Sequence, residues 1–319
     1  LVVAVQDRLR SPAERGAPAD RRLAFLLALP LAATFYPVIH GYALGQIQVF
    51  LDAGVALALL AFLMGRRGWA GLVLAGCTLV KPQFAVVLIW SLWRREHRFS
   101  LGYALGIAVG LSLSLWRFGF ADHWAYLGVL QEIARHGESL YLNQSVNGLL
   151  NRWLENGVAV PPKGTYQSDF APEHAGIRVA TMVSSVVILL LAFDPFRWRR
   201  RSAGIVDLIV VLAAATIAAP VAWDHHYGIF LPMFAVALPL TIAWVPWSGA
   251  KGMLLGASFF LVGFAFVDPD WFLREPYRML LFSHVFFGAI AFFGLLLGMR
   301  AAQVRRFVPF HPLDDRRQL

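Results

Sequence analysis

The chain has 319 residues, of which 58% are hydrophobic and only 15% are charged. Soluble domains carry about 25% charged residues, so this composition indicates a polytopic membrane protein. The net charge of +9 does not indicate nucleic-acid binding, because the basic residues lie in short runs between apolar segments rather than on one soluble face. The single cysteine, Cys77, excludes an intrachain disulfide framework and a cysteine-based zinc site.

The chain begins with five apolar residues, LVVAV, which run directly into the polar stretch QDRLRSPAERGAPADRR. Five residues are too few for the core of a signal peptide, and no basic residues precede them. We therefore expect these residues to be the last turn of a helix whose start is absent, and the chain to be incomplete at its N-terminus.

Eight apolar segments approach the roughly 20 residues that a helix needs to cross a bilayer. They are residues 23–39, 49–64, 99–116, 178–193, 203–219, 228–247, 252–267 and 279–299. If the loop 6–22 is cytoplasmic, the arginine-rich loops near residues 66, 95 and 199 also lie inside, as the positive-inside rule requires. We predict a single membrane domain over 1–319, with an external loop region over 117–177 and a cytoplasmic basic tail over 300–319.

Residues 69–93 do not fit a simple alternation, because the arginines at both ends belong on the same side. Lys81 and Pro82 divide this segment into two pieces of about 12 residues, each about 18 Å long and too short for a core of about 30 Å. Proline also disfavours helical geometry in the residue before it. We predict a broken, re-entrant helical hairpin with Lys81 at its tip. The alternative is one spanning helix with a proline kink and a buried lysine.

Polar residues gather on the predicted external side. The stretch HGYALGQIQ contains Tyr42 and Gln46, and an amide at the start of a membrane helix usually has a partner. Asp52 lies about one turn further into the same helix, and a lone intramembrane carboxylate should face the bundle interior or a wet cavity. Pairing with Lys81 is the alternative for Asp52.

The external loop region begins with a helical pattern. Apolar residues recur at helical spacing opposite polar ones, which predicts an amphipathic helix along the membrane interface. The apolar positions are Trp124, Leu127, Leu130 and Ile133. The stretch NQSVNG follows, and its Asn143, Gln144 and Asn147 offer donors and acceptors that match sugar hydroxyls or phosphate oxygens. A capping turn before the next helix is the alternative.

The stretch APVAWDHHYGIFLP places Asp224, His225 and His226 between two apolar segments. Histidine acts as acid, base or metal ligand near neutral pH, and a flanking carboxylate orients it. Adjacent histidines cannot share a helix face, so we expect different partners for the two. The chain has no HExxH or comparable spacing, and no GxSxG, Walker or Rossmann motif. We therefore expect no metal site, and a plain polar loop is the alternative reading.

Four segments occur in a recognisable order: YPVIHGYALGQIQVFL, AGLVLAGCTLVKPQFAVVLIWSLWRR, NQSVNGLLNR and APVAWDHHYGIFLP. Together they resemble the integral-membrane glycosyltransferases of the GT-C superfamily, and within it family 87, the polyprenol-phosphate-mannose-dependent α-mannosyltransferases. The resemblance runs over about residues 23–297.

The resemblance implies an all-α, multi-pass helical bundle of the GT-C type in a bacterial-type cytoplasmic membrane, with its active side external. It implies transfer of a sugar, mannose or another hexose or pentose, from a polyprenyl-phosphate donor to a lipid or glycan acceptor. Membrane lipids, donor and acceptor are the expected partners, with no nucleic acid and no metal or other cofactor. The catalytic acidic residue is expected upstream of this chain, and neither Asp52 nor Asp224 takes its place.

Under this reading Lys81 binds the donor phosphate at the hairpin tip, where a lysine provides a cation near headgroup level. The WDHH segment binds the phosphate or an acceptor hydroxyl. The remaining substrate-binding residues are Gln46, Tyr42, Asn143, Gln144 and Asn147. The leading rival is a transporter or lipid flippase, for which broken helices are also typical. A membrane scaffold without catalysis is a second rival.

Overall fold

The computed structural model describes residues 1–9, 18–160, 170–194, 204–244, 249–264 and 276–305. Within these ranges every regular element is a helix, which confirms the predicted all-α class. The arginine-rich loop near residue 199, much of the N-terminal loop and the basic tail beyond residue 305 lie outside the described residues.

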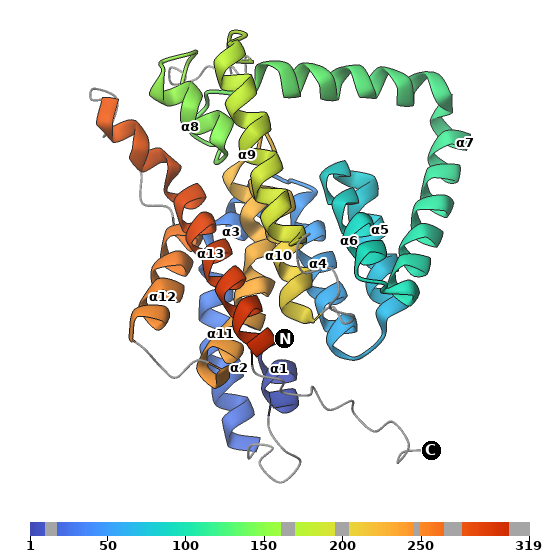
Figure 1. The fold of residues 1–319 in the computed structure, drawn as a ribbon, viewed down its shortest axis with the longest axis vertical. Coiled ribbons are helices and arrows are strands. Elements are labelled where there is room, and N and C mark those ends of the chain that lie inside the picture. The colour runs from blue at the N-terminus through green and yellow to red at the C-terminus, as the bar shows by residue number, and fades with distance from the viewer. Residues whose placement is uncertain (10–17, 161–169, 195–203, 245–248, 265–275, 306–319) are drawn as a thin grey trace.

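Figure 1 shows the helices as one bundle. Along the chain they are α1 (Val2–Leu9), α2 (Pro18–Ala33), α3 (Tyr36–Ala43), α4 (Gln48–Leu63), α5 (Arg67–Val80), η2 (Pro82–Ala85), α6 (Val86–Trp93), α7 (His97–His136), α8 (Val146–Trp153), α9 (Ala175–Phe193), α10 (Ile205–Ile217), η4 (Asp224–Ile229), α11 (Phe230–Trp244), α12 (Gly249–Gly263), η6 (Pro276–Ser283) and α13 (His284–Arg305). Four stretches are long and apolar enough to cross a membrane: His97–His136, Ala175–Phe193, Asp224–Ile242 and Leu280–Ala302. Five shorter apolar helices accompany them, so the chain is a polytopic membrane protein.

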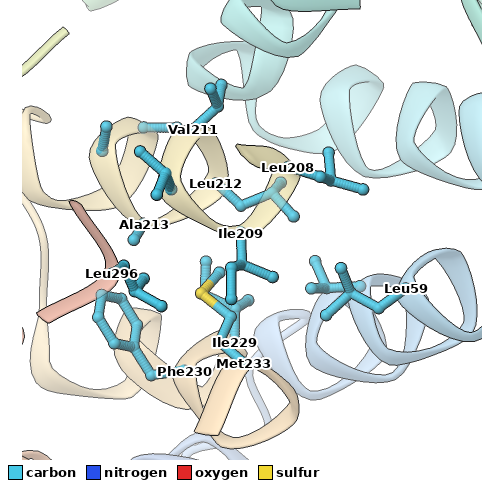
Figure 2. Close-up of a cluster of buried hydrophobic side chains, with 14 of the residues drawn as sticks. Leu59, Leu208, Ile209, Val211, Leu212, Ala213, Ile229, Phe230, Met233 and Leu296 are labelled. Atoms are coloured by element: carbon cyan, nitrogen blue, oxygen red, sulfur yellow. The ribbon is translucent and has the colours of Figure 1, made fainter. Parts of the chain in front are cut away.

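Helix α10 is the centre of the bundle. All its residues from Ile205 to Ile217 are buried, as expected for a helix that is apolar on every side. Figure 2 shows its side chains meeting those of α4, α11 and α13. The labelled residues in this cluster are Leu59, Leu208, Ile209, Val211, Leu212, Ala213, Ile229, Phe230, Met233 and Leu296.

Residues 67–93 form the predicted hairpin. Helix α5 is about 21 Å long at about 1.5 Å per residue, which is shorter than a bilayer core. It ends at Lys81, whose backbone is extended, and the chain returns through η2 and α6. The Arg67 Nε atom lies 3.9 Å from Glu96 Oε2, so the two ends of the hairpin meet. This contact contradicts the alternative of one spanning helix.

Glycines let the hairpin lie close to α7. A Cβ atom on Gly71 would collide with the backbone of Phe99, and one on Gly102 would collide with the backbone of Gly68. Small residues at such positions allow two membrane helices to approach at backbone distance. The hairpin is therefore held against α7 along its length.

The predicted segment 23–39 is not one helix. Helix α2 ends at Ala33 and α3 begins at Tyr36, with Pro37 in its first turn. Proline favours the first turn because its missing N–H would lack a helical partner there anyway. The polar stretch after residue 40 consequently begins inside α3, rather than in a turn.

Helix α7 combines a predicted span with the predicted amphipathic helix. Gly119 interrupts it with φ 79° and ψ 171°, a conformation that is nearly restricted to glycine. Figure 1 shows that the part after Gly119, residues 120–136, turns sharply and runs across the end of the bundle towards α9. We call it the arm. Its Phe120 and Trp124 are 71% and 65% exposed, as expected for anchors in a membrane interface.

The start of α10 carries a buried ion pair. The Nε and Nη2 atoms of Arg94 donate to the Asp207 carboxylate over 2.7 and 3.2 Å, and the Trp90 indole donates over 3.0 Å. Arg300 Nη1 adds a contact of 3.3 Å to the same carboxylate. Asp207 thus joins α6, α10 and α13 at the end of the bundle opposite η4.

Asp207→Asn should destabilise the protein by about 3–5 kcal/mol, because Arg94 then remains buried without a compensating charge. Denaturant or thermal unfolding in detergent measures the change. Asp122→Asn, an exposed carboxylate on the arm, is the matched control and should change little. Equal stability of both variants would show that the Asp207 pair does not support the fold.

Candidate functional site

Two motifs that are far apart in the sequence lie side by side. The backbone N–H of Gln144 donates to the carbonyl of Ala222 over 2.7 Å, and the N–H of Asp224 donates to Leu142 over 3.0 Å. Asn143 and Trp223 form the antiparallel bridge between these bonds. Buried backbone groups need such partners, since water does not reach them. The NQSVNG and WDHH stretches therefore form one unit.

The Asn143 amide reinforces this pairing. Its Nδ2 donates to the carbonyl of Glu138 over 2.9 Å, and its Oδ1 accepts from the N–H of Ala222 over 3.0 Å. The Gln144 side chain donates to the carbonyl of Phe282 and accepts from the N–H of Phe286 over 3.2 Å. In both side-chain amides, the NH2 group donates to a protein group and the oxygen accepts from one.

Asn147 and Ser145 also act within the fold. Ser145 caps α8 by accepting from the N–H of Gly148 over 3.1 Å. Asn147 Oδ1 accepts from the N–H of Glu138 over 3.0 Å and from Asn151 over 2.8 Å. The stretch is thus the capping turn that the sequence left as an alternative. The side chains of Asn143, Gln144 and Asn147 therefore hold the loop together through hydrogen bonds within the protein. Their predicted contact with a sugar gains no support from this geometry.

Asp224 is the centre of a polar cluster on η4. The Nδ1 atom of His40, on α3, lies 3.0 Å from each Asp224 carboxylate oxygen. The backbone N–H of His225 donates to Asp224 Oδ1 over 2.6 Å. The His225 ring lies nearby, with Nδ1 3.6 Å from Asp224 Oδ1, and this buried nitrogen has no hydrogen-bond partner among the described residues.

The two adjacent histidines have different partners, as the sequence predicted. His226 Nδ1 accepts from the backbone N–H of Trp223 over 3.2 Å, which closes the first turn of η4. His225 instead faces Asp224 and His40. The plain-loop reading does not account for this, because Asp224 and His225 are both buried.

Asp52 lies against Gly228 of η4 and Lys81 lies near it, and neither residue lines the cavity described below. Gln48 Nε2 donates to Asp52 Oδ1 over 2.7 Å, and a Cβ atom on Gly228 would collide with the Asp52 carboxylate. Within the described part of the chain, Asp52 Oδ2 and Lys81 Nζ are buried without hydrogen-bond partners. The charge of Lys81 acts on both Asp52 and His226. Lys81 and Asp52 therefore interact through their charges without a direct bond.

A cavity of about 350 Å³ opens beside the paired loops. It connects the arm, the turn after α3 and the start of η4. Its lining residues are Gln46, Ile133, Glu138, Phe170, Val221, Trp223, His225 and His226. A larger cavity of about 490 Å³ lies at the hairpin's open end, where arginines and apolar residues line it. Only the smaller one combines a carboxylate with histidines, so we take it as the candidate site.

Glu138 is a cavity residue that sequence reasoning missed. It is 6% exposed, and its Oε2 accepts from the Trp223 indole N–H over 2.5 Å. Burial raises the pKa of its carboxyl, and the Trp223 hydrogen bond and the Arg152 charge oppose this rise. Glu138 directly follows Gly137, whose φ of 69° suits glycine and turns the chain out of the arm.

Arg152 holds the loops behind the cavity. Its guanidinium donates to the carbonyls of Leu140 and Asn143 over 2.8 and 2.9 Å, and to Ser283 over 2.6 Å. Burial lowers the pKa of this guanidinium to about 9, with the Glu138 charge acting in the opposite direction. Arg152 therefore stabilises the loops that form the site.

Some of the other predicted substrate-binding residues line the cavity and some do not. Gln46, His225 and His226 line the cavity, whereas Tyr42 is 79% exposed and is not among the lining residues. His40 was outside the predicted set, because its partner Asp224 lies 184 residues away and no local pattern links them.

Residues 1–223 match the model of glycosyltransferase family 87. The chain belongs to glycosyltransferase family 87. Membership makes the protein an enzyme that transfers a sugar, and its apolar helices make it a membrane glycosyltransferase. No curated protein and no solved structure matches the chain. The family match ends at Trp223, so geometry alone supports roles for the three residues that follow.

Glu138→Gln should change how stability depends on pH. A carboxyl with a raised folded-state pKa binds more protons folded than unfolded, so the wild type gains stability as pH falls through that pKa towards about 4.3. The gain is at most about 1.4 kcal/mol per pH unit, and the Gln variant lacks it. Unfolding of both proteins in detergent between pH 4.5 and 8 measures the difference. A difference that stays constant across this range would contradict a buried, ionisable Glu138.

Proposed function

We propose that this membrane glycosyltransferase transfers a sugar, mannose or another hexose or pentose, from a polyprenyl-phosphate donor to a lipid or glycan acceptor at the external membrane face. The observation that carries the proposal is the cavity of about 350 Å³, which a buried carboxylate and two histidines line together with Ile133 of the arm. A site at this level accepts a headgroup from the bilayer while the lipid chain stays in the membrane.

Lys81 and the two histidines near η4 suit an anionic donor. Lys81 Nζ has no hydrogen-bond partner among the described residues, and His225 and His226 line the cavity. A lysine binds phosphate through short, charge-assisted hydrogen bonds, and a histidine N–H can donate a further one. We assign Lys81 and the histidines to the phosphate side of the site.

Transfer replaces one bond at the anomeric carbon with another. The acceptor hydroxyl oxygen attacks that carbon, the bond to the phosphate oxygen breaks, and the phosphate leaves with the electron pair. The hydroxyl proton passes to a base. Glu138, which lines the same cavity as the histidines, accepts a hydrogen bond from a sugar or acceptor hydroxyl.

The transporter reading has less support. Broken helices are common in transporters, and α5 with α6 forms one here. The family match, however, is to glycosyltransferases.

Lys81→Met and the double variant His225→Ala/His226→Ala should each lower sugar transfer about 100-fold or more, because each removes a donor that stabilises charge on the leaving phosphate. The measurement is transfer from a polyprenyl-phosphate-linked sugar by the intact protein in nanodiscs. Folding of each variant is checked by its unfolding temperature.

His97→Ala is the matched control, since His97 is exposed at the first residue of α7, far from the cavity. It should leave transfer unchanged. Wild-type protein that transfers sugar only from a nucleotide-linked donor would contradict the proposed donor class. Normal rates in both site variants would instead remove these residues from the phosphate site.

A further inference from the structure

Three side chains that ligate metals converge beside the cavity. One ring nitrogen of His40, one of His225 and a carboxylate oxygen of Asp224 all lie within 4.8 Å of one another. His40 comes from α3, and the other two come from η4. The sequence predicted no metal site because only two of the three are neighbours in the chain.

The distances fit a small metal ion. In a tetrahedral site with bonds of about 2.0–2.1 Å, ligand atoms lie about 3.3 Å apart. The distances from Asp224 Oδ1 are 3.0 Å to His40 Nδ1 and 3.6 Å to His225 Nδ1. Two imidazoles and one carboxylate are also a ligand set that Zn²⁺ and related divalent ions prefer.

Hydrogen bonding alone explains only half of the cluster. His40 Nδ1 can donate a proton to Asp224, which satisfies both groups. His225 Nδ1 is too far from Asp224 to do the same, although the residue is 2% exposed and a buried polar atom without a partner is costly. A shared cation satisfies both ring nitrogens and the carboxylate together.

Neighbouring aromatic rings hold the two imidazoles in place. The Tyr36 ring stacks on His40 with 5.1 Å between ring centres, and the Trp223 ring meets His225 edge-on at 5.6 Å. Gly41 brings α3 against η4, since a Cβ atom there would lie 3.6 Å from the Cβ of His225. Ligands held this way need little reorganisation to bind an ion.

We infer that His40, Asp224 and His225 form a binding site for one divalent transition-metal ion, such as Zn²⁺. Three protein ligands leave a fourth position open, as in catalytic rather than structural zinc sites. Because His225 lines the cavity, this position is available to an oxygen of a bound molecule. Binding releases the His40 Nδ1 proton. The inference stands apart from the proposed function, because metal binding is measured without any sugar transfer.

The test loads the purified intact protein with Zn²⁺ or Co²⁺, removes free metal by dialysis, and measures bound metal by mass spectrometry. The wild type should retain about one ion per chain, and His40→Ala and His225→Ala should each weaken binding at least tenfold. His97→Ala should bind like the wild type. Wild-type retention no higher than that of the double variant His40→Ala/His225→Ala would overturn the inference.

A second variant identifies the ligand directly. In His40→Cys the sulfur lies nearer the backbone than Nδ1 does, and the longer metal–sulfur bond of about 2.3 Å compensates for part of this, with a small shift of the ion covering the rest. Its Co²⁺ complex should show a thiolate-to-cobalt charge-transfer band that is absent from the wild type, whose Cys77 is buried elsewhere. A folded His40→Cys variant that binds Co²⁺ without this band would also overturn the inference, even if sugar transfer is confirmed.

Discussion

The site depends on one short backbone pairing, in which residues 142–144 and 222–224 exchange hydrogen bonds across their antiparallel bridge. These bonds satisfy N–H and C=O groups of two buried loops, which have no helical hydrogen-bond partners. The pairing also brings the Trp223 indole to Glu138 and starts η4, so that His225 and His226 face the cavity. Arg152 and the buried amides strengthen the same junction from behind. Without it, the carboxylate and the histidines would belong to separate loops.

The two ends of the bundle use polar groups differently. At the start of α10, Asp207 is bonded to several donors, and its role is to join helices. Around η4, by contrast, Asp52 Oδ2, Lys81 Nζ and His225 Nδ1 are buried without hydrogen-bond partners in the described part of the chain. Unsatisfied buried polar atoms lower stability, so they persist where a ligand, an ion or water completes them. This contrast supports the choice of the cavity beside η4 as the candidate site.

The helical fold was predictable because hydropathy and arginine position act over short stretches of sequence. The Lys81-Pro82 break and the arginines at both ends were sufficient to predict the hairpin, which the Arg67–Glu96 contact confirms. The Tyr36-Pro37 pair marks a point where a helix should end or kink, and the chain does break there, between α2 and α3. The candidate site was harder. The amides of Asn143 and Asn147 resemble sugar ligands until their backbone partners are known. His40 and Glu138 can be recognised as site residues only from their contacts with Asp224 and Trp223, which are distant in the chain.

The hairpin also affects how the membrane crossings of this chain must be counted. A hydropathy profile registers residues 67–93 as one apolar stretch of spanning length, yet both of its ends lie on the same side. Counting it as a crossing reverses the assigned side of every loop that follows, including the paired loops and η4. Reporter fusions or accessibility labels placed before residue 67 and after residue 93 should therefore report the same side of the membrane.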